Sequence, residues 1–215
     1  PTSPNEGFDP DLEPQTAVNL ETGLKGRPTE RTRYSLALFR VRTRDEIVLV
    51  SGSPDRFANA GETRRDGVEL GLEHDFGNGL SLNGAWTWSD FRFRDDGAAI
   101  SADLQDNRLP GLPEHQLFLE ASWHRNGWFA ALDALGVSEV YADDANTEEV
   151  AGYAVVNARL AHTFFFGDHE LELAGGMNNL LDKEYFSNVR VNAPGDRYFE
   201  PAPQRNLYAT VRLRW

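Results

Sequence analysis

Histidines and paired carboxylates are the side chains of this sequence whose types suit metal chemistry. The five histidines are scattered and form no H-x-x-x-H pair that would bring two imidazoles to one ion: His74, His115, His124, His162 and His169. Asp143-Asp144 followed by Glu148-Glu149 could bind calcium between loops, but the D-x-D-x-D-G spacing of a calcium loop is missing. We favour a solvated loop there, and predict neither a metal site nor a cofactor.

Side chains for nucleophilic catalysis are also poorly arranged. The sequence contains no cysteine, which removes thiolate chemistry and disulfides together. No G-x-S-x-G segment, which would present a serine on a sharp turn, occurs. Ser122 or Ser138 with a nearby histidine is the arrangement that remains, and an enzyme built on it is the weaker alternative. We predict no catalytic residue.

Arginines and tyrosines in polar segments are the side chains best suited to binding a ligand. Guanidinium groups and phenol rings fit anionic ligands that are planar or rich in oxygen, through charge-assisted hydrogen bonds and stacking. The competing interpretation is that each arginine pairs with a neighbouring carboxylate. The formal charge of −13 argues against a nucleic-acid partner. The ligand-binding candidates are Arg56, Arg108, Tyr141, Arg190, Arg197 and Tyr198.

Alternation of apolar and polar residues dominates the chain and predicts β-strands. In the last segment, one face carries Leu207, Ala209, Val211, Leu213 and Trp215, and the other carries Tyr208, Thr210, Arg212 and Arg214. The same alternation puts Asn157 and Arg159 on the polar face, which we expect to face a lumen. About nine strands are predicted, over residues 16–25, 33–49, 62–75, 80–93, 114–125, 128–139, 152–165, 170–181 and 205–215.

The connections alternate strictly between short turns and long polar loops. The short ones are residues 26–32, 77–79, 126–127 and 167–168, and the long ones are 51–61, 94–113, 141–152 and 182–204. In an antiparallel up-and-down meander, alternate connections lie at the same end, so one end is tight and the other carries every long loop. This asymmetry is typical of outer-membrane barrels. The predicted fold is therefore all-β, part of a transmembrane β-barrel.

Composition agrees with a β-barrel and excludes a helical membrane protein. No segment approaches the about 18–20 consecutive apolar residues of a membrane helix, and mean hydropathy is −0.52. A barrel keeps mean hydropathy low because only alternate residues face lipid. Aromatic residues gather where strands meet the short turns, as an interfacial girdle would require: Trp123, Trp128, Phe164, Phe165, Phe166 and Trp215.

Four motifs in order along the chain resemble those of the TonB-dependent outer-membrane transporters. Residues 179–185, Asn-Leu-Leu-Asp-Lys-Glu-Tyr, resemble the family's NLFDKxY motif, with Leu181 where phenylalanine is usual. Residues 12–15 with 21–25 are similar to the LxPE and ExGxK segments, and residues 59–61 with 67–69 to NAG and GVE. Residues 198–205 resemble the lead into the terminal strand. The NLFDKxY match places Asn179, Leu180, Asp182, Lys183 and Tyr185 as motif residues.

The resemblance implies uptake of a scarce nutrient, such as a ferric siderophore or another metal chelate or cofactor, across the outer membrane of a Gram-negative bacterium. Implied partners are membrane lipid, a small-molecule ligand, the TonB-ExbB-ExbD energy system and the outer-membrane assembly machinery, which would read Leu213 and Trp215. Barrels of this family have about 22 strands and a plugged lumen. We therefore expect residues 1–215 to be the C-terminal portion, without plug or N-terminal strands. A passive porin or structural barrel and a soluble lipocalin-like module are the alternatives.

Overall fold

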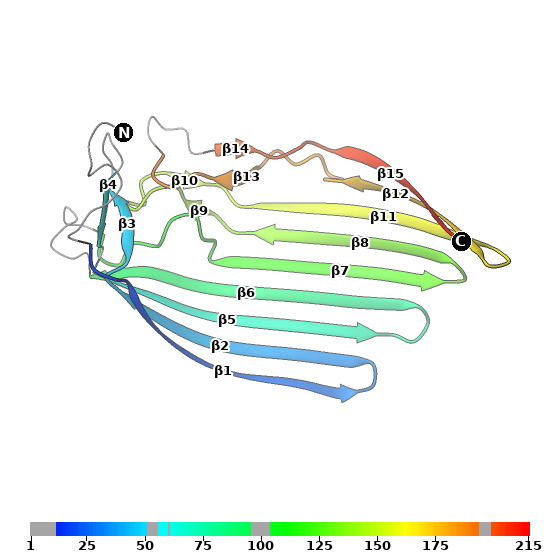
Figure 1. The fold of residues 1–215 in the computed structure, drawn as a ribbon, viewed down its shortest axis with the longest axis horizontal. Coiled ribbons are helices and arrows are strands. Elements are labelled where there is room, and N and C mark those ends of the chain that lie inside the picture. Colours follow the sequence, from blue (N-terminus) through cyan, green and yellow to red (C-terminus); the bar gives the residue numbers. More distant parts are fainter. Residues whose placement is uncertain (1–11, 51–55, 60, 96–103, 194–198) are drawn as a thin grey trace.

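One antiparallel sheet makes up the body of the protein in the computed structural model, which describes residues 12–50, 56–59, 61–95, 104–193 and 199–215 (Figure 1). Its nine strands follow one another in chain order as an up-and-down meander. The sheet is open, with the first and last strands as its edges. The strands are β1 (Thr16–Thr29), β2 (Thr32–Arg44), β5 (Glu62–Asp75), β6 (Leu80–Asp95), β7 (His115–Arg125), β8 (Trp128–Val137), β11 (Tyr153–Phe166), β12 (His169–Asn178) and β15 (Asn206–Arg214).

Three small hairpins are added within the long connections, all at one end of the sheet (Figure 1). They are β3 (Ile47–Val50) with β4 (Arg56–Asn59), β9 (Val140–Tyr141) with β10 (Glu149–Val150), and β13 (Phe186–Val189) with β14 (Phe199–Pro201). The opposite end carries only tight turns. The predicted parity of short and long connections is therefore confirmed.

The nine predicted strands are confirmed, and three of their boundaries are wrong by three residues or more. β1 continues to Thr29 rather than ending at residue 25, because the chain accommodates Pro28 at a register shift and turns only at residues 30 and 31. β2 ends at Arg44, not at residue 49, since Asp45 adopts a positive φ of 55° and begins a separate hairpin. β12 stops at Asn178 because Asn179, with φ 52°, turns the chain out of the sheet.

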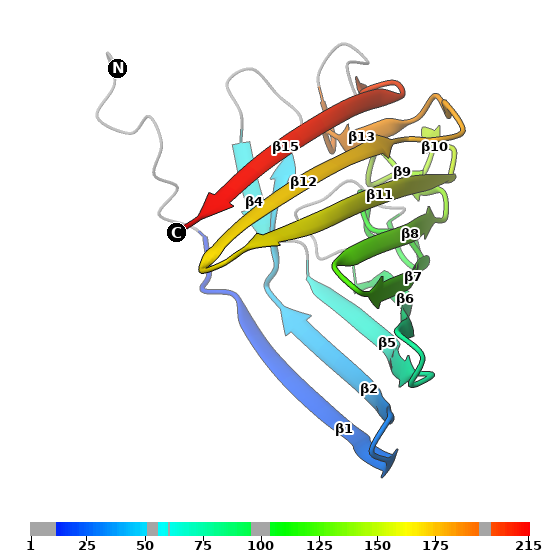
Figure 2. The same cartoon turned by 90° about the vertical axis from the view of Figure 1, so that its right-hand side faces the viewer.

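The two faces of the sheet differ in burial because the sheet is strongly curved (Figure 2). The buried side chains of the nine strands all lie on one face: Thr43, Thr63, Phe93, Ala131 and Val155. The opposite face exposes large apolar side chains, including Leu20, Leu38, Leu70, Leu72, Leu119, Leu132, Leu160, Leu173 and Val211. Side chains crowd on the inside of a curve and spread on its outside. The first face is therefore concave and the leucine-rich face convex.

The convex face exposes large apolar side chains, which a sheet in a soluble protein would bury. Leu132, at the centre of β8, is 53% exposed, and its register partners Ala121 and Ala158 are also apolar. Contiguous apolar surface of this kind marks contact with lipid or with another protein. Among the described residues, no helix is long and apolar enough to cross a membrane.

Candidate functional site: the loop layer and the concave face

Three of the long connections, those after β6, β8 and β12, meet in one hydrogen-bonded layer beyond the sheet. Asn146 joins the connection after β6 to the one after β8, since its Oδ1 accepts from Arg108 N at 2.7 Å and its Nδ2 donates to Arg108 O at 2.9 Å. Asn146 can serve both groups because its positive φ of 56° turns the side chain back across the loop. Two loops remote in sequence are thereby held in fixed relative position.

A third connection, the one before β14, is tied into the same layer by Asn192. Its Oδ1 accepts from Asp144 N at 3.0 Å, and its Nδ2 donates to Asp144 Oδ2 at 2.8 Å. The backbone N of Asn192 also donates to Ala142 O at 3.0 Å, and Asn107 Nδ2 donates to Asp144 O at 3.0 Å. Asp144 is thus the point at which three connections meet.

The carboxyl group of Asp144 is partly buried, and burial disfavours its charged form. Burial raises the pKa of Asp144 above its ordinary value, the hydrogen bond from Asn192 opposes that rise, and the nearby charges of Asp143 and Glu46 reinforce it. A carboxyl group whose pKa is raised by folding stabilises the folded layer below its ordinary pKa. That stability is lost as pH increases through the raised pKa.

We expect Asp144→Asn to remove this pH dependence, because an amide fills the same place without ionising. Amide hydrogen-exchange protection of residues 141–150, corrected for intrinsic exchange, should fall between pH 4.5 and 7.5 in the wild-type protein and stay constant in the variant. Asp168→Asn, in an exposed turn at the other end of the sheet, serves as the control. Wild-type protection that is constant with pH would contradict the assignment.

The predicted ligand-binding residues are only partly brought together. Arg108 lies in the loop layer, where it pairs with Glu114 and lies 3.9 Å from Glu139 Oε1. Arg190 Nε lies 3.8 Å from Glu200 Oε1. Both arginines thus have carboxylate neighbours, as the competing interpretation required.

Tyr141 belongs to the same layer through its backbone, since its O accepts from Gly111 N at 2.8 Å. Arg56 lies in the outer hairpin, where it is the register partner of Val50. Arg197 and Tyr198 lie outside the described residues. The loop layer therefore contains Arg108 and Tyr141 of the six candidates.

The concave face carries a polar network around the middle of β7 and β8. Asn157 Nδ2 donates to Asp133 Oδ2 at 2.7 Å. Arg159 pairs with Glu120 and lies 3.9 Å from Asp133 Oδ1. The predicted shared face of Asn157 and Arg159 is thus the face that also bears these two carboxylates.

Residues 179–185 contact this network at its long-loop side, through Asn179. Asn179 is 2% exposed; its backbone N donates to Asn157 Oδ1 at 2.9 Å. Its side chain closes a turn on Lys183: Oδ1 accepts from Lys183 N and Nδ2 donates to Lys183 O, each at 2.8 Å. Asp182 Oδ1 accepts from Arg205 N at 2.9 Å, which fixes the entry to β15. The side chains of Asn179 and Asp182 therefore hold the turn and the start of β15 in place.

The other two motif residues anchor the same turn to β11. Leu180 N donates to Val156 O at 2.7 Å. The Tyr185 ring lies 4.4 Å from the ring of Tyr153, between centroids. The five motif residues therefore form one structural unit at the top of β11 and β12.

The end of the chain lies at the tight-turn end of the sheet (Figure 1). Leu213 is the register partner of Leu171, is 57% exposed and faces the convex side. Trp215 is 88% exposed. A strand of this kind presents an apolar edge that another chain or a membrane can contact.

One serine of the catalytic alternative, Ser138, is hydrogen-bonded to the backbone. Ser138 Oγ accepts from the backbone N of His115 at 3.1 Å and donates to Glu139 O at 3.3 Å. The His115 ring instead stacks on Trp86, with 5.8 Å between ring centroids. Asp143 was considered above as a calcium ligand. Its Oδ1 accepts hydrogen bonds from the backbone N of Thr147 and of Glu148, within its own loop. Over the described part of the chain, no three histidine or acidic residues are grouped to hold a metal ion.

Sequence reasoning missed Asn107, Asn146 and Asn192, which organise the loop layer. It also placed Asp144 in a solvated loop, which is wrong, because folding buries that carboxylate and Asn192 Nδ2 donates to it. Asn146 and Asn192 both have positive φ, at 56° and 53°. Asparagine in a polar segment is a weak signal for such a turn. The partners lie 37 to 48 residues apart in sequence, so no local pattern could have paired them.

A curved antiparallel meander with an apolar convex face, tight turns at one end and long loops at the other is the wall of a membrane β-barrel. The family model "TonB dependent receptor-like, beta-barrel" matches residues 1–180. The chain therefore belongs to that family, as its motifs indicated.

Relatives agree with this family. The probable TonB-dependent siderophore receptor PiuA of Acinetobacter baumannii is 24% identical over 213 residues, covering 95% of this chain and 28% of the relative. The ferrioxamine B receptor of Salmonella typhimurium is 26% identical over 182 residues, covering 81% of this chain and 25% of the relative. The chain thus spans about a quarter of the length of these relatives.

Solved structures share the fold. The unliganded ferric citrate transporter FecA superposes with a TM-score of 0.77 at 21% identity, covering 91% of this chain and 30% of that one. The PiuA crystal structure superposes with a TM-score of 0.74 at 24% identity, covering 91% and 28%. At 21% and 24% sequence identity, these structural similarities show that the fold is shared and nothing more.

Proposed function

We propose that the protein carrying this chain is an outer-membrane active transporter that takes up a ferric siderophore or another metal chelate at the expense of energy delivered by TonB. The observation that supports it most is the pairing of a lipid-compatible convex face with a rigid, polar loop layer at one end only. Membership of the TonB-dependent receptor family supports the energy source. The names of relatives, among them siderophore and ferrioxamine receptors, support the class of ligand.

In this proposal the outer membrane of a Gram-negative bacterium holds the barrel, with the loop layer outside and the tight turns in the periplasm. The concave face, with Asn157 and Arg159, lines the lumen. TonB, with ExbB and ExbD, would act through parts of the protein other than residues 1–215. Leu213 and Trp215 would be read by the assembly machinery. The proposal assigns no catalytic residue to the chain.

The long loops would determine which chelate the transporter binds. Tyr141 lies in a layer whose position is fixed by Asn146 and Asp144, so a chelate meets preorganised groups rather than mobile ones. An anionic, oxygen-rich chelate suits guanidinium and phenol groups. Specificity would then reside in residues 94–113 and 182–204.

The test is uptake of radioactive iron chelates by a siderophore-deficient host that expresses the protein, with TonB present and with TonB deleted. We expect uptake of at least one hydroxamate or catecholate chelate, abolished without TonB. Exchanging residues 94–113 and 182–204 with those of a relative should change which chelate is used. Uptake that persists without TonB, together with ohmic conductance in a planar bilayer, would instead identify a passive porin.

A further inference from the structure

A row of arginines crosses the convex face between the leucine-rich band and the loop layer. Arg42 on β2 is the register partner of Arg64 on β5, and Arg64 is the partner of Arg92 on β6. An isolated bridge then pairs Arg92 with Arg108. Like charges directly opposite one another on a sheet destabilise it. Arg108 pairs with Glu114, and an anion bound along the row would offset the repulsion that the chain's own carboxylates leave.

The carboxylates near this row neutralise it only in part. Asp66 is shared by Arg40, at 2.6 Å, and Arg64, at 3.1 Å, and Asp90 pairs with Arg92 at 2.6 Å. Arg44 Nε lies 3.8 Å from Glu62 Oε2. Among the described residues, no carboxylate lies within 4.0 Å of the exposed guanidinium of Arg42.

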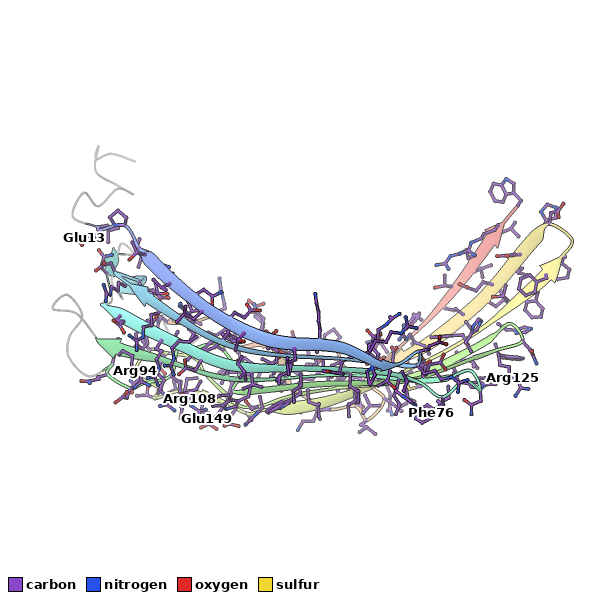
Figure 3. The ribbon with its side chains drawn as sticks, turned by 90° about the horizontal axis from the view of Figure 1, so that it is seen from below. Glu13, Phe76, Arg94, Arg108, Arg125 and Glu149 are labelled. Atoms are coloured by element: carbon purple, nitrogen blue, oxygen red, sulfur yellow. The ribbon has the colours of Figure 1, made fainter. Side chains whose placement is uncertain are left out.

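One more cation stands at the upper edge of this surface. Arg94 pairs with Asp106, but its buried Nε has no hydrogen-bond acceptor among the described residues. Figure 3 places Arg94 and Arg108 at the long-loop end of the sheet, with Phe76 and Arg125 at the tight-turn end. Arg94 therefore adds to the guanidinium groups at the long-loop end of the sheet.

Apolar side chains lie directly beside these cations. On β1, Leu20 is the register partner of Arg40, and Val18 is the partner of Arg42. Both are prominent on the convex face, 67% and 65% exposed. With Thr16 and Arg44 they line a groove of about 460 Å³. Arginine stems can lie along an apolar surface while their guanidinium groups reach polar surroundings.

We propose that this surface, defined by Val18, Leu20, Arg40, Arg42, Arg44, Arg64 and Arg92, binds a phosphorylated lipid of the membrane leaflet at the long-loop end. The lipid's phosphates bridge the arginine row, and an acyl chain lies over Val18 and Leu20. Guanidinium groups bind phosphate by paired, charge-assisted hydrogen bonds, which a row of arginines can repeat. The inference rests on the membrane placement proposed above, and neither on the ligand transported nor on TonB.

The test uses the whole protein, purified from membranes in mild detergent, freed of lipid and titrated with bisphosphorylated lipid A under native mass spectrometry. Arg42→Gln with Arg44→Gln removes one unpaired and one weakly paired arginine. Arg33→Gln with Arg125→Gln is the control at the tight-turn end. Arg33 lies on the concave face, where it pairs with Glu73 at 3.3 Å, and Arg125 lies on the convex face. Membrane-facing arginines attract anionic lipid headgroups, so the first variant should bind lipid A roughly tenfold or more weakly. The control should bind as the wild type does.

A variant with lysines, Arg42→Lys with Arg44→Lys, keeps the charge but not the paired hydrogen bonds, so it should recover part of the affinity, which separates charge loss from misfolding. Equal binding by the glutamine variant and the wild type would overturn the proposal. Inositol hexakisphosphate binding as tightly as lipid A would overturn the lipid assignment, because it lacks acyl chains. Chelate uptake by the same glutamine variant should be unchanged. Loss of lipid binding with uptake retained therefore supports this site, and lipid binding without any chelate uptake rejects only the proposed function.

Discussion

Leu132→Arg is expected to lower the free energy of unfolding of the membrane-inserted protein by about 2–4 kcal/mol, the cost of a cationic side chain facing the bilayer midplane. Leu132 is at the centre of β8 on the convex face and is 53% exposed. In water, an arginine at so exposed a position would change stability by less than about 0.5 kcal/mol. The size of the effect thus reports which medium surrounds the convex face.

The measurement is urea unfolding of the whole protein in phospholipid vesicles, followed by tryptophan fluorescence. Leu132→Ala is the same-site control, since it removes the leucine without adding a charge and separates lost apolar contact from the cost of the cation. A Leu132→Arg protein as stable as Leu132→Ala would show that the convex face does not meet lipid, and the membrane placement would be withdrawn.

The second large effect is expected from Asn179→Ala, which should destabilise the protein by about 2–4 kcal/mol. Loss of the two side-chain bonds to Lys183 N and O contributes about 1–3 kcal/mol. An alanine held at the positive φ of Asn179 adds about 1 kcal/mol. The turn would no longer close, and the bond from Asn179 N to Asn157 Oδ1 would weaken with it.

Two further variants separate these causes. Asn179→Gly keeps the backbone relaxed and loses only the hydrogen bonds, so it should lie between wild type and Asn179→Ala. Asn178→Ala is the neighbouring control, because exposed Asn178 makes a single side-chain bond, to Asn206 Oδ1 at 2.9 Å. Urea midpoints of the inserted protein give the order. If Asn178→Ala proved as damaging as Asn179→Ala, the assigned role of the Asn179 turn would be wrong.

The sheet was predictable because its pattern is local. Alternation in residues 205–215 fixed which side chains share a face, and the structure pairs Leu207, Val211 and Leu213 with apolar residues of β12. The strand ends were less predictable. Asp45 and Asn179 end strands through positive φ, which asparagine and aspartate tolerate but do not enforce.

The family motifs were readable from sequence, and their physical role was not. Gly67 is an example, since the structure places the Phe39 ring where a Cβ at Gly67 would lie. Phe39 belongs to the neighbouring strand, as the register partner of Gly67. A glycine alone does not show what approaches it.

By itself the sequence determined the strands, their order, the two faces and the family, because each depends on residues near one another in the chain. Only the tertiary structure decided what meets across the sheet and between the loops. Asn146 reaches Arg108 across 38 residues, and Asp144 reaches Asn192 across 48. The arginine row exists only because the register sets Arg42, Arg64 and Arg92 side by side. Register is a property of paired strands, and a shift of one residue would move each arginine to the other face.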